Sequence, residues 1–114
     1  MQMNDPYQIE VRFWISCNGK SLLGKGKMQL LRQIDRYGSL RQAAEGLNLS
    51  YRKAYYMIYS MNKTAERPVV EMKRGGKNGG LSELTPYGKW LILEFDQIEK
   101  QLDQFIHPLN VTTE

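Results

Sequence analysis

Apolar and polar side chains alternate strictly from Tyr7 to Ser16, and a period of two is typical of a β-strand with one buried face. An Asn18-Gly19 pair follows, which is a strong signal for a hairpin turn. The pattern therefore predicts a half-buried strand over Tyr7–Ser16 and a short returning strand over Lys20–Leu23.

Further along, the apolar residues take up the spacing of a helix. Met28, Leu31 and Ile34 form one apolar stripe in a predicted helix over Lys27–Tyr37, which Gly38 ends as a C-cap. The glycines before Lys27 break the pattern and separate this helix from the hairpin.

Two more short helices are predicted between Gly38 and Lys63. Ser39 is an N-cap candidate for the first, and Ala43 and Ala44 leave room for a closely crossing helix. Ser50 is an N-cap candidate for the second, after a link of three residues. Two short helices joined in this way predict a helix-turn-helix unit.

The second helix of this unit has two contrasting faces. Its apolar face is formed by Ala54, Ile58, Met61 and Ala65, and Tyr51 and Met57 flank it. Its opposite face carries Arg52, Tyr56, Tyr59 and Lys63, with Lys53 and Ser60 near the edge. Cations and hydroxyls can donate to guanine or phosphate, whereas a carboxylate would be repelled, and none lies there. This favours a recognition helix, although many surface helices carry Arg and Lys.

A glycine-rich hairpin is predicted directly after that helix. Val69–Arg74 and Leu81–Leu84 are predicted strands, and the tip at Gly75–Gly80 holds four glycines. With Arg74 and Lys77 as its cations, the hairpin is predicted to be a wing that meets the DNA backbone or minor groove. The spacing of a phosphate-binding P-loop is absent from the tip. A glycine hairpin with solvated cations remains the alternative.

The last predicted helix begins at Thr85, an N-cap candidate, with Pro86 in its first position, and ends at Pro108. Its apolar residues follow steps of four, three, four and three, which is a two-position heptad seam: Leu91, Phe95, Ile98, Leu102 and Phe105. A seam this narrow favours a partner helix, so we expect a dimerisation surface. Packing of the helix on its own domain is the alternative.

These elements predict a mainly α fold with small β structure. We expect a winged helix-turn-helix with an N-terminal strand in residues 1–84, a long dimerisation helix in residues 85–107 and a tail in residues 108–114. At 114 residues the chain has the length of one ordinary domain.

Charge is distributed unevenly, with a net charge of +4 overall. Residues 7–80 hold 14 Lys or Arg and 5 Asp or Glu, whereas residues 81–114 hold 2 and 6. A basic body with an acidic last helix predicts a polyanionic partner at one end of the molecule.

Other classes of function find little support in the sequence. There is no apolar run of membrane-spanning length and no signal peptide, and the single cysteine, Cys17, fits a reducing cytoplasm. His107 is the only histidine, and no His, Cys or carboxylate cluster has metal-ligand spacing. We expect no enzyme activity, no cofactor and no metal site.

The residues resemble the N-terminal DNA-binding domain of the molybdate-responsive regulator ModE, a winged helix-turn-helix related to the LysR type. The matching pieces are Gly24, Leu30-Leu31 with Ile34, Gly38-Ser39, Ala43-Ala44, Ser50-Tyr51-Arg52-Lys53-Ala54, Met61-Asn62, Val70-Glu71, Gly75–Gly80, Leu84-Thr85 and Gly88. Tyr55 departs from the pattern, because the family usually has Trp there. The resemblance implies a homodimeric transcription regulator joined through its long C-terminal helix. The family's molybdate-binding module follows this domain and the chain stops at Glu114, so molybdate binding is not expected here.

The leading hypothesis is a sequence-specific regulator that binds double-stranded DNA as a homodimer, linked through the resemblance to molybdate transport or metabolism. A winged-helix module that binds a protein partner through Tyr56 and Tyr59 is the alternative. The predicted DNA-binding residues are Ser39, Arg41, Ser50, Arg52, Lys53, Tyr56, Tyr59, Lys63, Arg74, Lys77 and Asn78.

Overall fold

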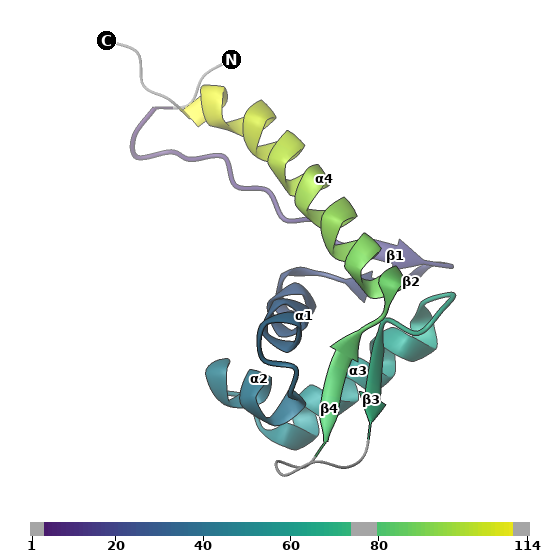
Figure 1. Ribbon diagram of the computed structural model, residues 1–114. Helices are drawn as coiled ribbons and strands as arrows, with labels where there is room; N and C mark the ends of the chain where they lie inside the picture. Colours follow the sequence, from purple (N-terminus) through teal and green to yellow (C-terminus); the bar gives the residue numbers. More distant parts are fainter. Residues whose placement is uncertain (1–3, 74–79, 111–114) are drawn as a thin grey trace.

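The computed structural model describes residues 4–73 and 80–110, which form four helices and two small antiparallel hairpins. In chain order the elements are β1 (Ile15–Cys17), β2 (Lys20–Leu23), α1 (Lys25–Tyr37), α2 (Leu40–Gly46), α3 (Tyr51–Thr64), β3 (Val70–Lys73), β4 (Leu81–Leu84) and α4 (Pro86–Asn110). Helices α1 to α3 and the β3–β4 hairpin form a body from which α4 projects (Figure 1). The predicted mainly α, winged helix-turn-helix fold is confirmed.

The core lies where α1, α2 and α3 meet. Leu30 and Leu31 of α1, Ala43 of α2, and Ala54 and Ile58 of α3 are fully buried. The alanines let the helix backbones approach closely, and the larger residues fill the space around them. The buried stripes predicted from helical spacing are therefore the faces that meet.

Local capping signals set the ends of these helices. The N–H of Gln42 donates to Ser39 Oγ at 3.2 Å, and the N–H of Lys53 donates to Ser50 Oγ at 3.1 Å, so both predicted N-caps are confirmed. Gly38 closes α1 with a φ of 65°, which favours glycine. Helix α1 begins earlier than predicted, at Lys25, and Gly26 lies inside it.

The prediction of a strand over Tyr7–Ser16 was wrong for most of its length. Only Ile15–Cys17 is a strand, paired with β2 across the confirmed Asn18-Gly19 turn. The residues before Ile15 run alongside α4 instead (Figure 1). The backbone N–H and C=O groups of a strand form hydrogen bonds with a neighbouring strand. Residues before Ile15 have the helix α4 as their neighbour, so they do not form a strand.

Side chains of α4 hold this N-terminal segment. Asn110 Nδ2 donates to the carbonyl of Ile9 at 2.9 Å, and the N–H of Ile9 donates to Asn110 Oδ1 at 2.8 Å. Nearer the body, the rings of Phe13 and Phe95 stack with their centroids 4.4 Å apart. The segment is thus tied to α4 at both ends.

Helix α4 continues past the predicted stop. Pro108 lies inside its final turn and the helix ends at Asn110, so the predicted end at Pro108 was wrong. The remainder of the predicted tail lies outside the described residues. None of the helices within residues 4–73 and 80–110 is long and apolar enough to cross a membrane.

Candidate nucleic-acid interface

Helix α3 buries one side and leaves the opposite side open to solvent. Ala54, Ile58 and Met61 are fully buried, whereas Tyr56 and Tyr59 are 54% and 53% exposed. The cations predicted for the outer face, Arg52, Lys53 and Lys63, are exposed as well. The carboxylate-free face of α3 is therefore available to a partner.

Two of these cations lie over tyrosine rings one helical turn away. Arg52 Cζ is 5.7 Å from the centroid of the Tyr56 ring, and Lys63 Nζ is 5.7 Å from that of Tyr59. Both distances fall within the range of cation–π attraction. The open face of α3 thus consists of paired cations and phenols.

Asn62 fastens the wing to α3. Its Oδ1 accepts from the N–H groups of Val69, at 2.7 Å, and Val70, at 3.1 Å, and its Nδ2 donates to the carbonyl of Val70 at 2.9 Å. Three hydrogen bonds from one side chain hold the start of β3 beside α3. Sequence reasoning missed this role, for which the signal was an amide side chain shortly before the Pro68 break.

The wing itself is a regular antiparallel pair. Met72 faces Ser82 and Lys73 faces Leu81, and Lys73 Nζ lies 3.7 Å from Glu83 Oε2. The N–H of Ser82 donates to the carbonyl of Gly38 at 3.0 Å, which joins β4 to the start of α2. The predicted strand Leu81–Leu84 is confirmed, and the one predicted over Val69–Arg74 is confirmed for Val70–Lys73. The predicted tip residues Arg74, Lys77 and Asn78 lie outside the described residues.

A groove of about 410 Å³ separates the wing from α2 and α3. The predicted DNA-binding residues Ser39 and Arg41 line it, together with Lys73 of the wing. Tyr51 and Tyr55 of α3 also line the groove and were not predicted as binding residues. Tyr51 was expected beside the core, but its side chain is about half exposed. The tertiary structure thus places cations from two separate elements around one polar groove.

The two predicted serines have structural roles. Ser39 is buried and Ser50 is exposed, and each hydroxyl caps a helix. Each hydroxyl oxygen accepts one backbone N–H within the chain, so the primary role of both serines is to cap a helix.

The predicted heptad seam of α4 divides into two halves. Leu91 and Phe95 are buried in the protein's own core, whereas Ile98 is 36% and Phe105 68% exposed. Leu102, between them, is half-buried. The expectation that the whole seam faces a second copy must be corrected for Leu91 and Phe95, because α4 first packs on its own domain. Ile98, Leu102 and Phe105 remain candidates.

An ion pair joins α4 to α1. Arg32 Nη2 is paired with Asp96 Oδ1, and Arg32 Nη1 donates to Asp96 Oδ2 at 3.3 Å. This hydrogen bonding outweighs partial burial and raises the pKa of Arg32 above its ordinary value.

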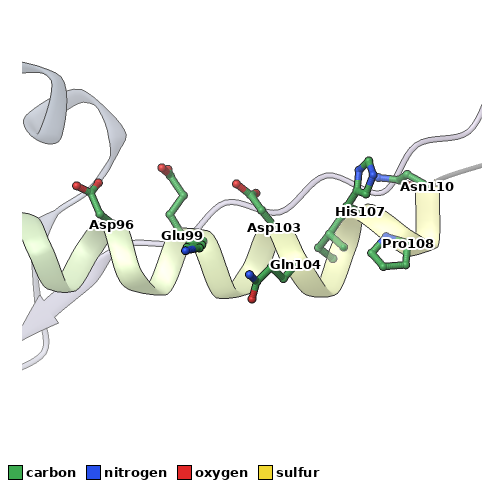
Figure 2. Close-up of a pocket in the computed structure, with 9 residues that line it drawn as sticks. Asp96, Glu99, Asp103, Gln104, His107, Pro108 and Asn110 are labelled. Atoms are coloured by element: carbon green, nitrogen blue, oxygen red, sulfur yellow. The ribbon is translucent and has the colours of Figure 1, made fainter.

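Asp96 also belongs to a row of acidic side chains along one side of α4. Figure 2 shows Asp96, Glu99 and Asp103 projecting from the same side of the helix, with His107 further along. They line a shallow groove of about 940 Å³ with Gln104 and other α4 residues. Within the part of the chain that the structure describes, no three His, Cys, Asp or Glu side chains are grouped so as to hold a metal ion.

The three-helix core and the wing fastened to α3 define a winged helix-turn-helix protein. Among proteins of known role, the chain is similar to transcriptional regulators named ModE. It is 37% identical to transcriptional regulator ModE from Haemophilus influenzae over 73% of its length. It is 35% identical to the DNA-binding transcriptional dual regulator ModE from Escherichia coli over 78% of its length.

A third relative has a different name. The molybdenum-pterin-binding protein MopB from Rhodobacter capsulatus is 39% identical over 78% of the chain. The chain spans about a third of the length of these curated relatives, 32% to 34%. No family model matches the chain. The similarities confirm the resemblance to ModE regulators, and the relatives' names as regulators agree with the prediction against enzyme activity.

Proposed function

We propose that this chain binds double-stranded DNA in a sequence-specific manner, as a homodimer, and regulates transcription in connection with molybdenum. The observation that carries the proposal is the exposed side of α3, which presents Arg52, Lys53 and Lys63 without a carboxylate. The names of the ModE relatives support the same role.

The dimensions of α3 suit a major groove. An α-helix with its side chains is about 10–12 Å across, which matches the groove width of about 12 Å, and the 14 residues of α3 extend for about 21 Å. Asn62 holds the wing beside α3, so one rigid unit can engage a groove and the adjoining backbone. This supports binding to a duplex more than to a single strand, which would be held by stacking in a groove.

Arg52 is our candidate for reading a base, and Lys53 for a phosphate, because Arg can donate two hydrogen bonds to guanine O6 and N7. Both lie in the first turn of α3. We expect Arg52→Ala to relax the preference at one base pair by about 1–3 kcal/mol. Equal losses of affinity for specific and random duplexes would mean that Arg52 contacts only the backbone.

Dimerisation is proposed through the distal half of α4. Ile98, Leu102 and Phe105 offer apolar surface there, at the far end of the molecule from the wing (Figure 1). Two recognition helices related by a two-fold axis would bind half-sites about 34–36 Å apart, or multiples of that distance. The bound sequence should therefore be palindromic.

Selection of bound sites from random duplex DNA tests the proposal as a whole. We expect a palindromic consensus, bound about 10³–10⁵ times more weakly at 200 mM than at 50 mM salt if 6–10 phosphates are contacted. Failure to retain any duplex at low salt, or binding that does not respond to salt, would refute it.

A protein-binding module is the second candidate, favoured by the half-exposed rings of Tyr56 and Tyr59. It predicts that charge-reversed variants of α3 lose a protein partner and that the wild-type chain retains no duplex. We propose a cytoplasmic location, as expected for a DNA-binding regulator.

A further inference from the structure

The guanidinium of Arg52 lies over the ring of Tyr56 on the exposed side of α3. They are four residues apart, so they lie one above the other on the helix surface. Arg52 Cζ is 5.7 Å from the ring centroid, and Tyr56 is 54% exposed. The ring therefore forms a shelf for the guanidinium that solvent and DNA can reach.

The ring of Tyr56 is itself in contact with a second aromatic ring. The ring of Tyr55 meets that of Tyr56 edge-on, with centroids 5.9 Å apart and an interplanar angle of 82°. Aromatic pairs favour this edge-to-face arrangement. Tyr55 lines the groove beside the wing, so the position of the Tyr56 ring is linked to the groove wall.

A stacked guanidinium keeps its hydrogen-bonding edge free. Where a guanidinium lies flat over a ring, its N–H donors point outward within its own plane, and Arg52 Cζ lies over the Tyr56 ring. An Arg side chain has several rotatable bonds, and ordering them on binding lowers affinity. A ring that orders the side chain in advance reduces that loss and directs the donors to one place.

We propose that Tyr56 is a positioning residue for Arg52, and that base discrimination by Arg52 depends on the aromatic ring of Tyr56 and not on its hydroxyl. This inference rests on the proposed function and goes further, since it assigns Tyr56 a role in specificity without a base contact of its own. Tyr59 holds Lys63 at the same spacing. Because an ammonium is a compact point charge without a planar fork, the Tyr59 pair serves affinity for phosphate.

The test compares duplexes that differ at the single base pair where Arg52→Ala loses discrimination. We expect Tyr56→Phe to keep that discrimination, because the ring stays, and Tyr56→Leu to reduce it about two- to fivefold. The double variant Arg52→Ala/Tyr56→Leu should discriminate no worse than Arg52→Ala. The matched control, Tyr59→Leu, should weaken binding to both duplexes equally.

A measurement without DNA tests the shelf directly. The ring current of Tyr56 should shift the side-chain proton resonances of Arg52 upfield, and Tyr56→Leu should abolish that shift while the melting temperature stays unchanged. Absence of the shift in the wild-type protein would overturn the inference.

Two results with DNA would also overturn it. If Tyr56→Phe loses as much discrimination as Tyr56→Leu, the hydroxyl makes a contact of its own. If Tyr56→Leu keeps the discrimination, Arg52 needs no shelf. In both cases the sequence preference of the wild-type protein survives, so the proposed function stands; a wild-type protein without any sequence preference would refute the proposed function and this inference together.

Discussion

Helices α3 and α4 are both amphipathic and both bury one stripe, but their exposed sides have opposite chemistry. The exposed side of α3 carries Arg52, Lys53 and Lys63 among tyrosines. Helix α4 instead carries the carboxylates of Asp96, Glu99 and Asp103 on one side, and the exposed apolar ring of Phe105 lies on another side. The two helices are alike in their buried apolar stripes. They differ in their exposed residues, and these residues indicate a separate role for each helix.

The cationic side of α3 and the acidic side of α4 lie far apart in the molecule. The molecule is 60 Å long, and α4 projects from the body that contains α3 (Figure 1). At physiological salt the Debye length is about 8 Å, so carboxylates far along α4 hardly affect the potential at α3. The proposed DNA-binding surface and the proposed dimer surface thus lie at opposite ends of the molecule.

The largest change in stability is expected from a comparison of alanine substitutions in the two halves of α4. Phe95 is buried and stacked on Phe13, so Phe95→Ala should lower the free energy of unfolding by about 3–5 kcal/mol in urea titrations. Phe105 is exposed, so Phe105→Ala, measured at low protein concentration, should change it by less than about 0.5 kcal/mol.

Sedimentation of the same variants completes this comparison. Phe105→Ala should shift the protein toward monomer, because it removes apolar surface from the proposed interface. Equal losses of unfolding free energy in the two variants would mean that the distal half of α4 also belongs to the core.

The junction between the wing and α4 gives the next largest effect. A Cβ at Gly88 would lie 2.3 Å from the carbonyl oxygen of Val69, so Gly88→Ala must displace backbone and should cost about 1–3 kcal/mol. Gly26 has open space around it inside α1, and Gly26→Ala should stabilise by about 0.5–1 kcal/mol. Thermal unfolding of both variants measures the contrast, and similar melting temperatures would argue against the close contact.

A matched charge reversal tests the contrast between the exposed sides. Lys63→Glu on α3 should weaken duplex binding about tenfold, or by about 1.4 kcal/mol, whereas Lys100→Glu on α4 should change it by no more than about twofold. The two substitutions change the net charge equally, so a fluorescence anisotropy titration isolates position. Equal losses would show that only total charge matters.

The smallest effect concerns the ion pair that joins α4 to α1. Both side chains of the Arg32–Asp96 pair are about 40% exposed, so water screens their attraction. We expect Asp96→Asn to cost about 0.2–1 kcal/mol, and less in 1 M salt. A loss that does not respond to salt would mean that Asp96 acts through packing instead of charge.

Local signals in the sequence were enough to predict most elements of the body. Ser39, Ser50 and Gly38 mark helix ends through bonds to residues at most four positions away, and Asn18-Gly19 marks its turn in the same way. The prediction of a strand over Tyr7–Ser16 was wrong for most of its length, because alternation of apolar and polar residues indicates that one face is buried but not which element covers that face. That element, α4, lies about a hundred residues further along the chain.

The exposed side of α3 was predictable residue by residue, because one short helix contains both its buried and its exposed positions. The groove between α2, α3 and the wing was not, since Arg41, Tyr55 and Lys73 come together only when separate elements pack. The anchoring role of Asn62 and the close approach of Gly88 to Val69 are long-range contacts of the same kind.

By itself, then, the sequence determined the helices, their caps, the wing strands and the positive side of α3, because each depends on neighbours within one or two helical turns. Only the tertiary structure decided which half of the α4 seam is buried in the chain's own core. It also decided that the N-terminal segment packs against α4 and that the ring of Tyr56 lies beneath Arg52. Those outcomes depend on which surfaces remain uncovered after the core has packed, and a one-dimensional pattern of apolar residues does not contain that information.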